Sequence, residues 1–370
     1  MEQKLLHTPE GVRDICNEEC EKKLILQEQL RLVMQSYGYR DIETPTFEFF
    51  DVFSKEVGTI PSKDLYKFFD REGNTLALRP DITPSIARAA AKYDFGETTA
   101  IRLCYAGNTF INNSSYQGRL KETTQLGAEL IGDNSVDADA EIAAMMIECL
   151  LKAGLRDFQI SIGQVDFFKS LLKEAGIDED TEQKLKNLIS NKNNFGVEEL
   201  LSKLHIREDL KEIFVNLPNI YGTTEVLERV RTMTTNADAL KALDRLQELY
   251  EILCIYGFER YISFDLGMLS HYMYYTGVIF RAYTFGTGDA VVKGGRYDHL
   301  LKHFGKDAPS IGFVVESDQL LNALSRQKIE IATPPAPFVL HYQSEQREAA
   351  IAEAKRRRSA GQKVALVRKE

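Results

Sequence analysis

The sequence predicts an α+β fold, with an antiparallel sheet flanked by helices, a helical insertion and a small C-terminal βαβ unit. Hairpin patterns outnumber strand–helix–strand patterns, which favours an antiparallel sheet. Leucine and isoleucine recur at helical spacings through residues 166–258, which predicts an all-helical block between strands. A proline-rich stretch, residues 333–337, precedes one last strand–helix–strand pattern.

The first half of the chain alternates helices with strands and hairpins. A helix is expected between Asn17 and Gly38, because Leu26, Leu30 and Val33 share one face and glycine favours the helix end. The elements expected after it are a strand (39–45), a hairpin (66–79), a helix (84–92), a long hairpin (101–132), a helix (138–151) and a strand (158–163).

The second half returns to strands after the helical insertion. The expected strands are 261–266, 278–283, 290–292 and 311–315. We therefore predict one domain over residues 1–325, a linker at 326–337 and a partial α/β unit at 338–370. The last unit is expected to contain a strand (338–341), a helix (344–359) and a strand (364–367).

Composition excludes several classes of protein. No apolar run approaches the length that spans a bilayer, and the first residues carry no signal-peptide core, so a cytoplasmic protein is expected. The five cysteines are odd in number and scattered, which argues against a disulfide framework. Cys16 and Cys20 lie four residues apart, but no second Cys or His pair accompanies them, so no metal site is predicted.

Charge disfavours a nucleic-acid partner. The formal net charge of 370 residues is −9, whereas phosphate binding needs a concentrated basic face. The one basic cluster, within residues 355–369, begins at the end of a predicted helix, where it complements the helix dipole and faces solvent.

Six motifs, in order, resemble those of histidyl-tRNA synthetases, which are class II aminoacyl-tRNA synthetases. They are Gly11-Val12-Arg13-Asp14, Pro45, Leu78-Arg79-Pro80-Asp81-Ile82-Thr83, the hairpin from Phe110 to Glu129, Tyr274-Tyr275-Thr276-Gly277, and Gly294-Gly295-Arg296-Tyr297-Asp298 with Ser310-Ile311-Gly312-Phe313. The resemblance covers roughly residues 8–325. It implies a class II aminoacyl-tRNA synthetase-like antiparallel sheet.

The resemblance also implies a histidine pocket. Its expected residues are Asp81, Thr83, Gln125, Glu129, Tyr274, Tyr275 and Tyr297. An ammonium group needs carboxylate or carbonyl acceptors, and an imidazole needs partners for two nitrogens. Gln125 and Glu129 lie four residues apart, which on a strand places both on one face. Taken singly, a Tyr-Tyr pair is typical of core packing, and Asp81 is typical of a helix N-cap.

The resemblance does not extend to the positively charged residues that the synthetases use in catalysis. Where the family has three arginines that meet ATP and the amino-acid carboxylate, this chain has Ile111, Ser270 and Gln319. Amino-acid activation builds negative charge on phosphate oxygens, and preorganised cations stabilise that charge. We therefore expect no catalytic residues, no bound metal and no cofactor.

A synthetase-like chain with a histidine pocket but without activation chemistry resembles the regulatory subunits of ATP phosphoribosyltransferase. The resemblance implies a role in histidine biosynthesis with a short-form catalytic subunit as partner, L-histidine as allosteric feedback effector, and a self-dimer within a hetero-oligomer. It implies no nucleic-acid or membrane partner. Two alternatives stay open: a histidyl-tRNA synthetase of atypical sequence, and a stand-alone histidine-sensing module.

Overall fold

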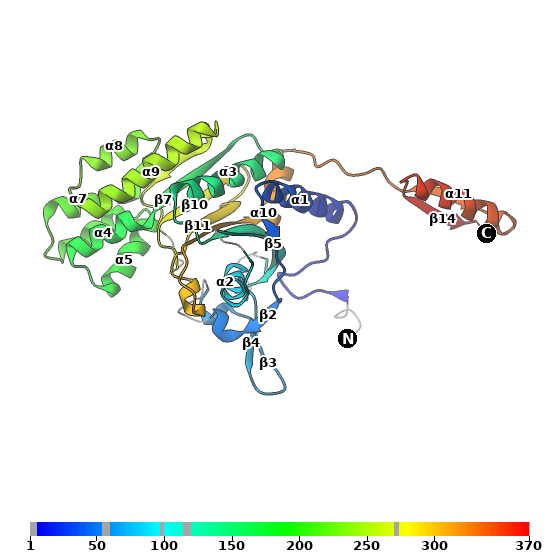
Figure 1. The fold of residues 1–370 in the computed structure, drawn as a ribbon, viewed down its shortest axis with the longest axis horizontal. Coiled ribbons are helices and arrows are strands. Elements are labelled where there is room, and N and C mark those ends of the chain that lie inside the picture. The colour runs from blue at the N-terminus through cyan, green and yellow to red at the C-terminus, as the bar shows by residue number, and fades with distance from the viewer. Residues whose placement is uncertain (1–5, 54–59, 97–99, 114–119, 270–273, 370) are drawn as a thin grey trace.

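The computed structural model describes residues 6–53, 60–96, 100–113, 120–269 and 274–369. Within them, nine strands form one large sheet flanked by helices (Figure 1). Across the sheet the strands are β1 (Arg40–Asp41), β5 (Ile101–Phe110), β6 (Glu122–Ile131), β12 (Ser310–Glu316), β11 (Val292–Arg296), β10 (Val278–Thr284), β7 (Phe158–Gln164), β9 (Ile262–Asp265) and β8 (Tyr221–Gly222). The long hairpin expected at 101–132 is confirmed as β5 and β6.

The sheet is mixed, where the sequence predicted an antiparallel one. Most neighbours are antiparallel, but β1 is parallel to β5 and β7 is parallel to β9. Parallel neighbours need a long crossover, and both pairs have one. The chain passes through α2 and a small sheet between β1 and β5, and through the helical insertion between β7 and β9.

Alternating side chains of the central strands face two different layers. On β6, Leu126, Ala128 and Leu130 are buried in the main core, on the face covered by α1 (Asn17–Ser36) and α3 (Val136–Lys152). The other face of the sheet packs against α2 (Thr83–Lys92) (Figure 1). Helix α10 (Ser317–Arg326) follows β12 directly. The period-2 pattern thus leaves every second residue of β6 free to form a site.

The insertion consists of helices, as predicted, together with the edge strand β8. The helices are α4 (Val165–Ala175), α5 (Glu179–Ser190), α6 (Asn194–Ser202), α7 (Glu208–Asn216), α8 (Glu225–Arg231) and α9 (Ala237–Ile255). Its leucine stripe is buried, with Leu171, Leu185 and Leu246 all fully enclosed. Helix α9 packs on both α3 and α4, so the insertion joins the helical layer of the main sheet (Figure 1).

A buried ion cluster joins the sheet to the helices. Asp139 at the start of α3 is completely buried and accepts from Arg296 of β11 (Nη2–Oδ1 2.6 Å) and from Arg245 of α9 (Nε–Oδ2 2.7 Å). Arg296 also donates to Asp298 (3.2 Å). Two guanidinium groups on one carboxylate fix the relative positions of three elements, since breaking such a pair leaves an uncompensated buried charge.

Two smaller sheets complete the structure. Strands β2 (Phe47–Phe49), β4 (Thr75–Leu78) and β3 (Lys67–Phe69) form an antiparallel sheet, which includes the hairpin predicted at 66–79. Strands β13 (Phe338–Tyr342) and β14 (Val364–Arg368) are parallel and flank α11 (Arg347–Ser359), so residues 338–368 form the expected βαβ unit. Among the described helices, none combines the length and apolarity needed to cross a bilayer.

Candidate functional site

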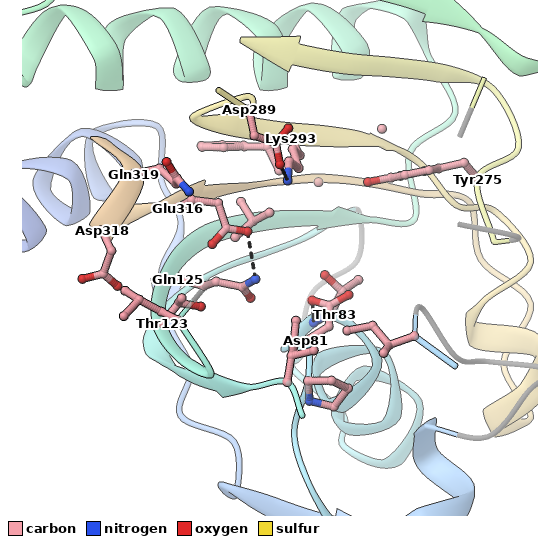
Figure 2. A pocket seen from close by; sticks show the side chains of 18 of the residues that line it. Asp81, Thr83, Thr123, Gln125, Tyr275, Asp289, Lys293, Glu316, Asp318 and Gln319 are labelled. Carbon is pink, nitrogen blue, oxygen red and sulfur yellow. Dashed lines mark hydrogen bonds and ion pairs between the residues drawn. The ribbon is translucent and has the colours of Figure 1, made fainter. Parts of the chain in front are cut away.

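The candidate site is a cavity of about 560 Å³ on the α2 face of the large sheet. All seven residues predicted for the pocket line it: Asp81, Thr83, Gln125, Glu129, Tyr274, Tyr275 and Tyr297. Ile111 and Gln319 line it as well, whereas Ser270 lies outside the described residues. Figure 2 shows that the labelled residues come from the start of α2, from the central strands, from the start of α10 and from the segment that carries Tyr275.

Glu129 is the deepest polar group of the cavity. Its carboxyl is 1% exposed and accepts only hydroxyl donors in the described structure. Thr83 and Tyr105 donate to Oε1 at 2.8 and 3.3 Å, and Tyr297 donates to Oε2 at 2.5 Å. A carboxylate offers about four acceptor positions, so these three donors leave one for a ligand.

Glycines on neighbouring strands make room for Glu129. In the β-sheet register, Glu129 lies opposite Gly312, and Gly312 lies opposite Gly295. A Cβ atom at Gly312 would lie 1.6 Å from Oε2 of Glu129, and a Cβ atom at Gly295 would lie 2.8 Å from the ring of Tyr275. No side chain fits at either position, because even a methyl group would overlap with the pocket residues.

Arg79 anchors the loop that carries Asp81 and Thr83. Its guanidinium donates to the carbonyl oxygens of Asn108 (2.8 Å) and Thr44 (2.8 Å), and the residue is 7% exposed. The arginine therefore ties the start of α2 to strand β5. Asp81 accepts from the backbone N–H of Thr83 (3.3 Å), while its other oxygen accepts from the Tyr274 hydroxyl (3.5 Å).

Three tyrosines form the opposite wall. The ring of Tyr274 lies 4.7 Å from that of Tyr275 and 5.9 Å from that of Tyr297, the latter edge to face. The hydroxyl of Thr276, which follows Tyr275 in the chain, donates to the carboxylate of Asp298 (3.0 Å). The backbone N–H of Thr276 donates to the carbonyl oxygen of Arg296 (2.8 Å). The tyrosine wall is thus fixed to β11 and to the buried ion cluster.

Gln125 and Glu316 divide the inner part of the cavity from the outer part. They are opposite residues on β6 and β12, and Nε2 of Gln125 donates to Oε1 of Glu316 at 3.3 Å (Figure 2). Oε1 of Gln125 is buried and has no hydrogen-bond partner among the residues that the structure describes. An unpaired buried acceptor is unfavourable, so this oxygen is available to a ligand donor.

The outer part of the cavity is acidic. Among the described lining residues, Lys293 is the sole cation, and its Nζ is paired with Asp289 at 2.8 Å. Asp318 is paired with Lys23 at 2.9 Å. Ile111 and Gln319, two of the positions where the resemblance places arginines, offer no positive charge to a phosphate group.

Burial raises the pKa of three carboxyl groups in the cavity. Desolvation raises the pKa of Glu129 to about 8, although Tyr297 and Thr83 oppose this through their hydrogen bonds. Desolvation also raises the pKa of Asp81 and of Glu316, against hydrogen bonds from Thr83 and the charge of Lys293 respectively. The raised pKa values indicate that few positive charges lie near these carboxyl groups. A cationic ligand would therefore stabilise their ionised forms.

Among the residues that sequence patterns missed are two that contact predicted pocket residues. Tyr105 contacts Glu129, and Glu316 contacts Gln125. Tyr105 could have been found from the alternation of β5, because it lies opposite Gly127 and faces the cavity side. Within the described residues, no group of three or more His, Cys, Asp or Glu side chains is arranged to hold a metal ion.

Comparison with known proteins confirms the resemblance deduced from the motifs. The histidyl-tRNA synthetase family model matches residues 11–320. The chain is 43% identical to an ATP phosphoribosyltransferase regulatory subunit of Acetivibrio thermocellus, over 93% of this chain and 82% of that protein. It is 40% identical to the subunit of that name in Ruminiclostridium cellulolyticum, over 94% of this chain and 83% of that protein.

A solved structure agrees with the sequence relatives. The crystal structure of an ATP phosphoribosyltransferase regulatory subunit/histidyl-tRNA synthetase from Bacillus halodurans is similar, with a TM-score of 0.89 and 34% identity. The match covers 98% of this chain and 93% of that chain. Its extent confirms the class II synthetase-like fold predicted from the sequence.

The raised pKa of Glu129 predicts a stability that falls with pH in the ligand-free protein. Between pH 4.5 and about 8, the folded chain keeps a proton that the unfolded chain has lost. Unfolding free energy should therefore decrease by about 1.4 kcal/mol per pH unit in this window from this group alone. Urea denaturation across the window should show a slope that is steeper in the wild type than in Glu129→Gln by this amount, since Asp81 and Glu316 contribute to both.

The exposed Glu248 on α9 provides the control for this measurement. Glu248→Gln should keep the wild-type pH dependence. If Glu129→Gln also keeps it, Glu129 does not retain a proton in the folded state.

Proposed function

Because this chain belongs to the histidyl-tRNA synthetase-like family of ATP phosphoribosyltransferase regulatory subunits, we propose that it is the non-catalytic, histidine-sensing subunit of such an enzyme. The observation that carries the proposal is a buried cavity rich in acceptors and poor in cations, with Glu129 at its base. That cavity suits an imidazole with an ammonium group and does not suit a nucleoside triphosphate.

In the proposed complex, the imidazole of L-histidine lies against Glu129 and the tyrosine wall. On binding, Glu129 releases its proton, and a ring N–H donates to the remaining acceptor position of the carboxylate. The ammonium group lies near Asp81 and Thr83, where the unpaired Oε1 of Gln125 provides a further acceptor. Each of these contacts replaces a desolvated or unpaired group with a charge-assisted hydrogen bond.

The non-catalytic part of the proposal rests on charge. Amino-acid activation requires cations at the developing phosphate charge, and the loss of one typically reduces the rate by 10²–10³. Ile111 and Gln319 cannot supply that charge, and Glu316 adds a carboxylate to the outer cavity. A histidyl-tRNA synthetase of atypical sequence is the alternative, and ATP–pyrophosphate exchange distinguishes it from the regulatory subunit.

Regulation requires that histidine binding differ between two states of the complex, with coupling typically about 1–3 kcal/mol. Tyr297 binds Glu129, and the adjacent Arg296 belongs to the ion cluster with Asp139 and Arg245. This succession of contacts leads from the pocket to α3 and α9. We propose that histidine shifts this contact network in a cytoplasmic hetero-oligomer with the short catalytic chain, and so provides feedback in histidine biosynthesis.

We propose self-association through α1 and the strand that follows it, about Cys16 to Pro45. Leu24 and Leu32 of α1 are 60% and 50% exposed. Large apolar side chains exposed on one helix are typical of an interface. A symmetric pairing would bury the same helix surface on both copies.

Isothermal titration of the isolated chain with L-histidine should show saturable binding. Glu129→Gln should weaken it by roughly tenfold or more, since a hydrogen bond to a charged group contributes about 1.5–3 kcal/mol. Glu248→Gln should bind as the wild type does. The same preparation should give no histidine-dependent ATP–pyrophosphate exchange, and exchange activity would contradict the non-catalytic role.

Reconstitution with a short-form ATP phosphoribosyltransferase catalytic chain tests the regulatory role. The complex should be inhibited by histidine, and inhibition should require this chain. A complex that contains Glu129→Gln should assemble and need roughly tenfold more histidine for half inhibition. Failure of the two chains to associate would instead favour a stand-alone histidine sensor.

Light scattering tests the self-dimer, with an expected mass about twice the 42.0 kDa of one chain. Leu32→Glu should shift the protein toward monomer, because it places a charge in the proposed apolar interface. Ile255→Glu, at an exposed position on α9, should not. A monomeric wild type at micromolar concentration contradicts the dimer.

A further inference from the structure

A second cavity, of about 500 Å³, lies between two helices of the insertion. We call it the α4–α9 groove; its residues are Gln164, Asp166, Lys169, Ser170, Lys173, Asp238, Lys241, Ala242 and Arg245. None of these residues lines the candidate histidine pocket. The groove therefore needs an explanation of its own.

The two helices present the same spacing of side chains to the groove. Counted from an aspartate, each helix has a lysine at the third position after it, a small residue at the fourth and a positively charged residue at the seventh. On α4 these are Asp166, Lys169, Ser170 and Lys173, and on α9 they are Asp238, Lys241, Ala242 and Arg245. This spacing keeps all four on one face of a helix. The small residues, Ser170 and Ala242, leave space between the helices. Of the four cations, Arg245 is paired with Asp139 and Lys241 with Asp238 (3.5 Å).

Hydrogen bonds join α9 to α4 at one end of the groove and hold the side chain of Arg245 at the other end. Asn236, which caps α9, donates to the carbonyl oxygen of Ser170 (3.4 Å) and to Glu174 (2.7 Å). Arg245 at the other end is held by Asp139 (2.7 Å) and by the carbonyl oxygen of Asn134 (3.0 Å). Hydrogen bonds therefore fix both ends of the groove, whereas its lysines are exposed to solvent.

Two lysines of the groove lack a partner. Within the described part of the chain, neither Lys169 nor Lys173 forms a salt bridge. Desolvation lowers the pKa of Lys169, while the nearby charge of Asp166 opposes this effect. A bound anion would stabilise both ammonium groups.

A buried donor is also unsatisfied at the groove. Gln164 is 2% exposed, and its Oε1 accepts from the backbone N–H of Asp166 at 3.3 Å. That hydrogen bond fixes the amide; its Nε2 is buried and has no hydrogen-bond partner among the described residues, and Gln164 is one of the residues that line the groove. Buried amide groups are normally paired, so this N–H₂ group indicates that an acceptor is missing.

We propose that the α4–α9 groove binds a phosphate-bearing anion, with Lys169, Lys173 and Lys241 on its oxygens and Gln164 as a neutral donor. Several lysines in one groove match the separated charges of a diphosphate or the phosphate of a phosphorylated sugar. The shared chemistry is the phosphate group. This site is separate from the proposed histidine pocket and does not depend on it.

Calorimetric titration of the full chain at low ionic strength tests the site with two probes, inorganic pyrophosphate and ribose 5-phosphate. At least one should bind saturably, and affinity should fall as salt is added. The double variant Lys169→Ala/Lys173→Ala should lose roughly tenfold or more in affinity. Gln164→Glu should also lose affinity, because it places a carboxylate where the anion needs a donor.

The matched control is the double variant Lys203→Ala/Lys211→Ala, which removes the same charge from exposed ion pairs elsewhere in the insertion. It should bind the probe as the wild type does, and thermal melting should confirm that all variants fold. Binding of either probe that depends on the groove residues supports the proposal. No binding of either probe, or an equal loss in the control, overturns it.

Discussion

The structure of the site depends on one buried carboxyl group. Glu129 occupies the middle of the large sheet, where a charge is unfavourable and every donor must come from a precise element of the fold. Its three hydroxyl donors arrive from α2, β5 and the end of β11, which are far apart in sequence. Gly312, which lies opposite Glu129 on β12, has no side chain, and this leaves space for the carboxyl.

The same residues connect the pocket to the helical layer. Tyr297 holds Glu129 on one side of the sheet, and Arg296, its neighbour in sequence, holds Asp139 on the other. Arg245 then joins Asp139 to α9 and lines the α4–α9 groove. Successive side chains of a strand point to opposite faces, so a single two-residue segment contacts both the cavity and the ion cluster.

Much of the pocket could be predicted because its motifs keep their order and spacing. Gln125 and Glu129 were expected on one face of a strand, and both line the cavity. Glu316 could not be predicted as the partner of Gln125, since 191 residues separate them and only the strand register brings them together. The parallel pairs of β1 with β5 and of β7 with β9 were missed for the same reason, because local patterns do not record which strands become neighbours.

The acidic outer cavity limits what a single new cation could do there. An arginine placed at position 111 or 319 would enter a space that already contains Glu316 and Asp318. Such a side chain would form an internal ion pair rather than remain open to a nucleotide. A phosphate-binding cation at either position would therefore require that these carboxylates be replaced as well.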